Sequence, residues 1–237
     1  MHYQKSAAFY DAIYAIRGKD YAQEAKRLHE LVRQHKKSMG NSLLDVACGT
    51  GIHISLLRNL YDAEGLDLDK KMLKVARKRC PGVVFHHGDM VNFKLACQYD
   101  VITCLFSSIG YAKTVGNLRK TVKTFARHLK PGGVAIIEPW FTPEAWRPGS
   151  VHATFVDQQE LKIARINISE RKRMLAVMNM HYLVGTPQGV TYFAELHEMG
   201  LFTHEEYLEA FRESGLEVVH DSEGLMGRGL YIGIKSE

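Results

Sequence analysis

Between residues 43 and 138, short apolar runs alternate with stretches in which apolar residues recur every three to four positions. The apolar runs have the length of strands and lie at 43–46, 62–67, 83–87, 99–105 and 134–138. Helical periodicity is clear at 70–78 and 118–129. Strands that alternate with helices form right-handed βαβ units around a parallel sheet. This region therefore predicts an α/β fold.

The stretch before it, residues 1–40, predicts two helices. Apolar residues from Ala7 to Ile16 recur on one face of the first helix, and residues 21–36 have the pattern of a second amphipathic helix. The interleaved charges Lys5, Asp11 and Asp20 are incompatible with the apolar segment of a secretory signal. We therefore interpret these residues as N-terminal helices that pack on the α/β core.

After residues 139–143 the pattern changes to strict alternation of apolar and polar residues. The alternating runs lie at 152–156, 161–169, 175–184 and 190–202. Period 2 with turn residues between the runs is typical of antiparallel hairpins. An antiparallel stretch inside an α/β chain predicts an insert, residues 150–202, that covers the crevice at the sheet edge rather than a separate domain.

The remaining residues, 203–237, return to the core. Thr203 followed three residues later by Glu206 resembles a capping box at the start of a helix over 205–214. Strands are predicted at 216–220 and 230–234. The whole chain, 1–237, is expected to form one domain whose cofactor-binding core is 43–138.

Composition excludes several classes of protein. The 46% hydrophobic and 24% charged residues are ordinary for a globular protein, and no apolar run has the length of a bilayer span. The net charge is +5, but the basic residues are dispersed and no nucleic-acid-binding module is appended. The four cysteines lack C-x-x-C pairing, and the 12 histidines form no spaced ligand set. We expect a cytoplasmic protein without metal, nucleic-acid partner or membrane partner.

Chemistry is concentrated in the loops that follow the predicted strands. Asp45 ends the first strand and leads into a loop containing Gly49 and Gly51, where backbone can approach a ligand closely. Asp67 ends the second strand, and an acid at this distance from the glycines can accept hydrogen bonds from ribose hydroxyls. Asp89 follows the third strand.

The run Asp-Val-Ala-Cys-Gly-Thr-Gly, followed by these acids in order, resembles the class I S-adenosylmethionine (SAM) methyltransferases. The resemblance implies a Rossmann-like, doubly wound and mainly parallel seven-stranded sheet with SAM as cofactor. It assigns Asp67 to the ribose, Asp89 and Met90 to the adenine, and Leu105 to the border of the sulfonium. The remaining cofactor residues that it implies are Arg17 for the methionyl carboxylate and Asp45, Ala47, Gly49 and Gly51 for the loop.

Other segments resemble a narrower family, the N,N-dimethyltransferases of dTDP-linked 3-amino deoxysugars. The matching stretches are 9–21, 44–51, 106–111, 138–140 and 227–230. The resemblance implies transfer of a methyl group to the amine of a small molecule, with Tyr14 and Tyr111 beside the transferred methyl. Since some relatives have histidine at the position of Tyr111, general-base catalysis there is in question. A tyrosine that orients a neutral amine is sufficient for proximity catalysis.

The acceptor is expected to be bound by Tyr14 together with residues at the end of a central strand, in the insert and in the last loops. These further candidates are Trp140, His181, His197 and Arg228. Core packing is the alternative for Trp140, and a structural loop role is the alternative for Arg228. The acceptor is either a nucleotide-linked amino sugar or another small metabolite. An RNA methyltransferase and a non-catalytic SAM-binding module are less favoured, and a homodimer is left open.

Overall fold

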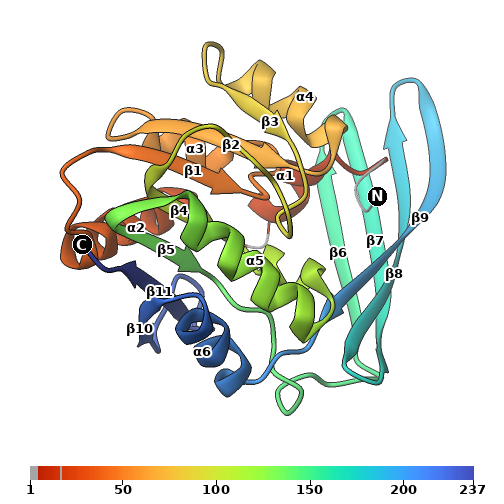
Figure 1. The fold of residues 1–237 in the computed structure, drawn as a ribbon. Helices are drawn as coiled ribbons and strands as arrows, with labels where there is room; N and C mark the ends of the chain where they lie inside the picture. Colours follow the sequence, from red (N-terminus) through yellow and green to blue (C-terminus); the bar gives the residue numbers. More distant parts are fainter. Residues whose placement is uncertain (1–4, 17) are drawn as a thin grey trace.

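A computed structural model describes residues 5–16 and 18–237 of the chain. Its strands form two sheets, a seven-stranded sheet in the order β10-β11-β5-β4-β1-β2-β3 and a four-stranded sheet in the order β6-β7-β8-β9. Figure 1 shows the second sheet standing beside the ends of the strands of the first. The described residues contain no helix that is both long and apolar enough to cross a bilayer.

Five neighbouring strands of the large sheet are parallel: β5, β4, β1, β2 and β3. Their bounds are Leu129–Ile137, Tyr99–Cys104, Ser42–Val46, Asp62–Asp67 and Phe85–His87, respectively. β10 (Leu216–Asp221) and β11 (Leu230–Lys235) complete the sheet as an antiparallel pair. The predicted α/β fold with a mainly parallel seven-stranded sheet is confirmed.

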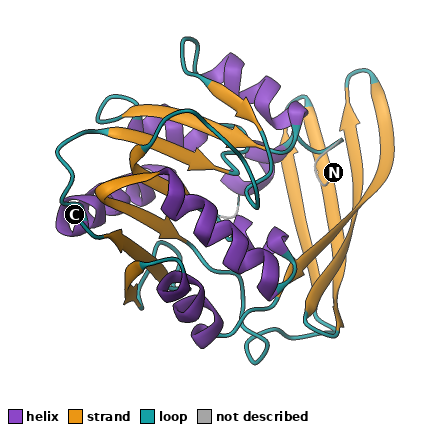
Figure 2. Cartoon of the chain, viewed as in Figure 1, coloured by secondary structure: helices purple, strands orange, loops and turns teal. Residues whose placement is uncertain are grey.

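Helices cover both faces of this sheet, as the secondary-structure colours in Figure 2 make clear. α5 (Val115–His128) and α6 (His204–Glu213) pack on one face through Phe125 and Phe211. α2 (Tyr21–His35), α3 (Ile52–Leu57) and α4 (Lys70–Arg79) pack on the other face. Each helix buries the apolar stripe that its period of 3.6 residues creates.

The four strands of the small sheet are antiparallel neighbours. Their bounds are Val151–Gln158 for β6, Leu161–Lys172 for β7, Leu175–Thr186 for β8 and Gly189–Gly200 for β9. Along β7 the buried and exposed side chains alternate because successive residues of a strand point to opposite faces. One face of the sheet therefore turns toward the core and the other toward solvent.

Two boundaries differ from the prediction. The first helix, α1, is only Tyr10–Ala15, shorter than the apolar pattern indicated. β5 begins at Leu129 and so includes Pro131, Gly132 and Gly133, which precede the predicted strand 134–138. The pairing shifts between Tyr99 and Val101, and this irregularity accommodates the extra residues in the sheet.

Candidate active site

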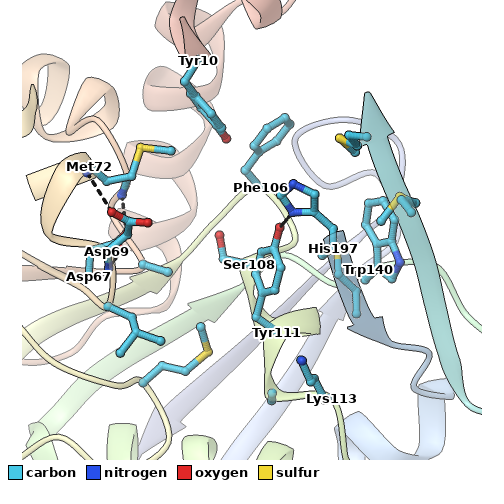
Figure 3. Close-up of a pocket in the computed structure, with 18 of the residues that line it drawn as sticks. Tyr10, Asp67, Asp69, Met72, Phe106, Ser108, Tyr111, Lys113, Trp140 and His197 are labelled. Carbon is cyan, nitrogen blue, oxygen red and sulfur yellow. Dashed lines mark hydrogen bonds between the residues drawn. The ribbon is translucent and has the colours of Figure 1, made fainter. Parts of the chain in front are cut away.

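A cavity of about 540 Å³ lies between the carboxyl ends of the parallel strands and the inward face of the small sheet. Ligands of doubly wound folds bind at this edge of the sheet, just beyond the strand ends. Figure 3 shows Asp67 and Asp69 on one side of the cavity and Trp140 and His197 on the other. The cavity therefore has a half built by the parallel core and a half built by the insert.

The loop after β1 forms the floor of the first half. Ala47 and Gly49 line the cavity and adopt positive φ angles of 58° and 57°. A Cβ added at Gly49 would meet nothing within 4 Å, so this loop presents open backbone to a ligand. Gly51 is the N-cap residue of α3 and lies against Ala76, where an added Cβ would be 3.1 Å from that side chain.

Asp67 lies at the end of β2 and faces this loop. Its carboxylate accepts hydrogen bonds from the backbone N–H groups of Gly49 at 2.8 Å and Asp69 at 2.7 Å. The residue is only 9% exposed, and burial raises the pKa of its carboxyl to about 6 despite these bonds. A buried carboxylate at the cavity wall is suited to accept hydrogen bonds from paired hydroxyl groups of a ligand.

Asp89 and Met90 extend the same wall after β3. Asp89 Oδ1 accepts from the backbone N–H of Val91 at 2.9 Å, which holds the carboxylate at the start of a turn. Met90 packs in part against the core on its other side. The structure thus brings Ala47, Gly49 and the three residues Asp67, Asp89 and Met90 to one surface.

Three predicted cofactor residues, Asp45, Gly51 and Leu105, do not line this cavity. Gly51 packs against Ala76 as described above. Asp45 is buried and accepts a hydrogen bond from Thr103 at 2.8 Å, so it joins β1 to β4. Leu105 is 4% exposed and belongs to the core on the α2 side of the sheet. The next residue, Phe106, lines the cavity instead. The prediction for Arg17 concerns a residue outside those that the structure describes.

Aromatic rings gather above the end of β4. The rings of Tyr10 and Tyr14 have centroids 4.6 Å apart, and Tyr14 meets Phe106 at 4.8 Å. All three line the cavity. Aromatic faces attract cations, so this cluster is a suitable environment for a positively charged sulfonium. Together with the acids and the open glycine loop, it makes the first half of the cavity fit SAM.

Lys19 is a cavity residue that the sequence did not single out. Its side chain is 1% exposed, and Nζ lies 2.7 Å from Glu24 Oε1 and 3.7 Å from the centroid of the Phe106 ring. Burial lowers the pKa of the Lys19 amine. Glu24 is also bonded to His53 at 2.8 Å. Lys19, Glu24 and His53 therefore form a buried group of charged or titratable side chains, which contacts the aromatic cluster through Lys19.

Tyr111 and His197 meet where the core touches the insert. Tyr111 lies on the short 3-10 helix η1 (Ser108–Ala112), and His197 lies on β9. Tyr111 Oη and His197 Nδ1 are 2.7 Å apart, and both residues line the cavity (Figure 3). One predicted catalytic residue and one predicted substrate residue are therefore direct partners.

Arg165 of β7 is the second residue that sequence reasoning missed. It is 5% exposed and lines the cavity. Its guanidinium is bonded to Thr154 Oγ1 at 3.1 Å and lies 3.5 Å from Tyr14 Oη. No carboxylate of the described residues lies within ion-pair distance of it. The only signal in the sequence was its place on the inward side of an alternating strand.

Arg228 lines the cavity but is partly engaged in the protein. Its Nη2 lies 3.0 Å from Oε1 of the fully buried Glu138. Trp140 also lines the cavity, in an aromatic group with Phe141 at 4.8 Å and Trp146 at 5.7 Å. Both candidates are therefore at the site, and both also take part in packing.

His181 is not brought to the cavity. Its side chain is exposed, and Nδ1 is bonded to Tyr192 Oη at 2.6 Å on the solvent face of the small sheet. Successive strand residues point to opposite faces, and His181 has the opposite parity to the neighbouring cavity residues Met178 and Met180. A contact with an acceptor in this cavity is not supported by its position.

Comparisons with known proteins agree with this geometry. A methyltransferase-domain family matches residues 43–133. The dTDP-3-amino-3,6-dideoxy-alpha-D-glucopyranose N,N-dimethyltransferase of Streptomyces fradiae is 42% identical over 230 residues, which cover 96% of this chain and 90% of that protein.

Two solved structures are similar over nearly their whole length. Streptomyces venezuelae DesVI superimposes with a TM-score of 0.92 at 40% identity, covering 98% of this chain and 99% of that one. SAM-bound CalS10, an amino pentose methyltransferase from Micromonospora echinaspora, superimposes with a TM-score of 0.86 at 36% identity, covering 96% and 97%. The chain is a SAM-dependent methyltransferase and belongs to the family of dTDP-amino-deoxysugar N,N-dimethyltransferases.

Proposed function

We propose that this enzyme methylates the amine of a dTDP-linked 3-amino deoxysugar. The observation that carries the proposal is Arg165, a buried guanidinium whose described partners are all neutral, on the insert side of the cavity. A buried cation is costly unless an anion accompanies it. The diphosphate of a nucleotide sugar supplies that anion, and a guanidinium group can bind phosphate oxygens through two parallel hydrogen bonds.

The two halves of the cavity suit the two reactants. SAM, when bound, supplies a methyl group on a positively charged sulfur. Asp67, Asp89, Met90, Ala47 and Gly49 are proposed to hold it. Tyr14 and Tyr111 then orient the neutral amine of the acceptor, since alignment of the lone pair is the main requirement for displacement at carbon.

Remote parts of the acceptor are proposed to supply the binding energy that positions the amine. Trp140 is suited to stack on the flat base, and Arg165 and Arg228 to contact the diphosphate. Arg228 is less suited than Arg165 to bind the diphosphate, because its Nη2 already donates to the carboxylate of Glu138. A substrate without base and phosphates would lack these contacts.

A screen of acceptors by mass spectrometry tests the proposal. Purified enzyme with SAM is given a dTDP-3-amino deoxysugar, the matching sugar 1-phosphate and the free amino sugar. We expect a gain of one or two methyl groups on the dTDP sugar and much slower turnover of the other two. Equal turnover of the free amino sugar, or methylation only of hydroxyl groups, contradicts the proposal.

A matched pair of variants ties that result to Arg165. Arg165→Met removes the cation, and we expect it to raise KM for the dTDP sugar by about 10- to 100-fold, as loss of a charged hydrogen bond of roughly 1.5–3 kcal/mol implies. Lys162→Met is the control, since Lys162 lies on the same strand but is exposed and paired with Asp157. An unchanged KM in Arg165→Met argues against the diphosphate contact.

We further propose that two copies of the chain associate through the solvent face of the small sheet. Large apolar side chains are 43–69% exposed there: Val151, Phe155, Ile166, Ile168, Leu183, Tyr192 and Leu196. Extended apolar patches mark protein interfaces, and the face of a sheet can pack against its own copy about a two-fold axis. Analytical ultracentrifugation should find a dimer that Leu183→Glu converts to a monomer still able to bind SAM; a monomeric wild type contradicts it.

The place of action is proposed to be the cytoplasm. The cysteines Cys48, Cys80, Cys97 and Cys104 are all free, which fits a reducing compartment. Fractionation of cells that make the protein, followed by immunoblotting, tests this; recovery outside the cytoplasm contradicts it.

A further inference from the structure

The contact between Tyr111 and His197 joins two elements of different origin. Tyr111 comes from η1, directly after a central strand of the core, whereas His197 comes from β9 of the insert. Tyr111 Oη and His197 Nδ1 are 2.7 Å apart, within the normal range of a hydrogen bond. This contact places a titratable imidazole behind a phenol that faces the cavity, as Figure 3 shows.

The direction of this bond is set by the tautomer of His197. A phenol has an ordinary pKa near 10 and an imidazole one near 6.5, so a neutral pair at pH 7 keeps the phenol proton on oxygen. In the tautomer protonated at Nε2, Tyr111 Oη donates to Nδ1 of His197, and a proton relay through the pair uses this arrangement. The oxygen of Tyr111 then keeps lone pairs that can accept from an N–H group in the cavity. The pair is therefore arranged to transfer a proton from a ligand in the cavity, by way of the Tyr111 hydroxyl, to the imidazole of His197.

Burial explains why a second group behind the tyrosine matters. His197 is 1% exposed, and Met178 is its register neighbour on β8. The charged pair beside it is Lys113 with Glu198, at 2.8 Å. A tyrosine that accepted a proton alone would carry a positive charge on oxygen, and one that lost its proton alone would be a buried phenolate. Coupled transfer to His197 avoids both states.

We propose that Tyr111 and His197 form a relay that removes the proton from the acceptor amine between the first and second methyl transfers. The inference rests on the proposed amine acceptor. After the first transfer the nitrogen is an ammonium with N–H bonds and no lone pair, so it cannot react again. Loss of one proton restores the lone pair.

The proton balance of this step is closed within the pair. An N–H bond of the ammonium breaks as an O–H bond forms on Tyr111, and the former phenol proton moves to His197 Nδ1. The products are a neutral secondary amine, a neutral tyrosine and an imidazolium. The imidazolium returns its proton by the same route to water once the product has left the cavity. Tyr111 touches the substrate, and His197 acts through it as a positioning residue and proton acceptor.

Three variants test the relay by the ratio of monomethyl to dimethyl product. His197→Asn keeps a hydrogen-bonding atom near the position of Nδ1 but cannot take up a proton, and Tyr111→Phe keeps the ring without the hydroxyl. His29→Asn is the control, because His29 makes a similar 2.8 Å bond to Tyr61 but does not line the cavity. Calorimetric titration with SAM establishes that each variant still binds the cofactor.

We expect the second methylation to slow by about 10- to 100-fold in both relay variants, at the lower end of what general acid–base catalysis contributes, so that monomethyl product accumulates. The double variant should be no slower than either single one, since the two residues act as a unit. The wild-type rate of the second transfer should rise with pH along one titration that His197→Asn abolishes. A merely structural contact would move neither the product ratio nor this profile.

Unchanged product ratios and pH profile in His197→Asn, with wild-type turnover of the amino sugar intact, overturn the relay alone. If Tyr111→Phe accumulates monomethyl product and His197→Asn does not, the relay is also overturned, and Tyr111 only orients the amine. Absence of amine methylation by the wild-type enzyme overturns the proposed function, and the relay falls with it. A wild-type enzyme that stops at one methyl group contradicts the relay as well.

Discussion

Arg228 Nη2 donates to Glu138 Oε1 across 3.0 Å, in an ion pair whose carboxylate is fully buried and whose arginine side chain is 19% exposed. Glu138 follows β5 and is fully buried, and its Oε2 accepts from the backbone N–H of Phe106 at 2.6 Å. Phe106 and Ser107 have positive φ angles of 52° and 60°, which non-glycine residues seldom adopt. The ion pair therefore holds the strained segment that leads into η1 and Tyr111.

Arg228→Ala is expected to destabilise the fold as well as to alter acceptor binding. Loss of one partner from a buried ion pair leaves an uncompensated carboxylate, which costs roughly 3–5 kcal/mol. We expect a decrease of about that size in the free energy of unfolding, measured by urea denaturation. Exposed Arg212, paired with Glu205 at 59% exposure of both side chains, provides the control variant Arg212→Ala, which should be within about 1 kcal/mol of wild type.

A double-mutant cycle separates the ion pair from a direct role in binding. Glu138→Gln combined with Arg228→Ala should destabilise by less than the sum of the two single changes, since both remove the same interaction. Additive changes in stability would contradict the described coupling. Loss of acceptor binding in Arg228→Ala without loss of stability would assign the side chain to the diphosphate alone.

Asp67→Asn should make the ligand-free protein more stable at pH 8 and weaken SAM binding. Burial raises the pKa of Asp67 to about 6 from 3.8, so the folded protein holds this proton more tightly than the unfolded chain does. The ionised carboxylate therefore costs stability as pH rises from about 4 to 6, by about 3 kcal/mol at most. We expect the variant to gain about 1–2 kcal/mol at pH 8, after the loss of carboxylate hydrogen bonds, and little at pH 4.

Unfolding by urea at both pH values and calorimetric titration with SAM measure the two effects. Wild-type SAM affinity should fall below pH 6 because a protonated carboxyl accepts fewer hydrogen bonds, and the affinity of Asp67→Asn should be weaker and less sensitive to pH. The prediction is contradicted if the difference in unfolding free energy between Asp67→Asn and wild type is the same at pH 8 and pH 4. It is also contradicted if the variant binds SAM as tightly as wild type.

Glu24→Gln is expected to destabilise the protein because it leaves Lys19 buried without its carboxylate. Burial acts to raise the pKa of Glu24, but hydrogen bonds from His53 and Lys19 outweigh it and lower the pKa. The ionised group thus adds stability that is present above its unfolded pKa and is lost as pH falls through the folded value. We expect a loss of about 3 kcal/mol at pH 7 that diminishes in acid, measured by urea unfolding.

Glu223→Gln is the matched control, because the Glu223 side chain is 83% exposed and lies 3.9 Å from Arg27. Such an exposed pair contributes little. Equal effects of the two substitutions would mean that the bonds of Glu24 to Lys19 and His53 add no more stability than an exposed ion pair does.

Gly110→Ala should disturb the junction between the core and the insert. An added Cβ would lie 2.9 Å from Met199 Cε and 3.2 Å from both Met199 Cβ and Trp140 Cβ, so the methionine side chain and the neighbouring backbone must move. Overpacking of this kind costs roughly 1–3 kcal/mol. We expect a lower melting temperature and a larger loss of kcat than of SAM affinity.

Gly116→Ala serves as the control, since an added Cβ there meets nothing within 4 Å. The substitution lies in the first turn of α5, where alanine is favoured over glycine. Stability equal to or above wild type is expected. If Gly110→Ala were as harmless as this control, the close packing of η1 against β9 would not constrain the site.

The sequence alone determined the order and type of the elements of the core. Apolar strands that alternate with helical stretches can bury their faces only as a doubly wound sheet, and period 2 in the insert allows only strands. The acids Asp67 and Asp89 and the loop with Ala47 and Gly49 were also predictable, since each follows a strand and the ends of parallel strands share one edge of the sheet. Local signals of this kind do not depend on the rest of the chain.

The tertiary structure decided which side chains face the cavity and which partners they meet. His197 points inward and His181 outward because the register of β8 and β9 sets the parity of each strand, and neither sequence position reveals that parity. The roles of Asp45, as a bond to Thr103, and of Arg228, as a partner of Glu138, depend on strands that are distant in the sequence. Arg165 and Lys19 are isolated charged residues in the sequence, and the sequence did not predict that they line the cavity. Their burial, and hence their chemical meaning, comes only from packing the insert and the N-terminal helices over the ends of the parallel strands.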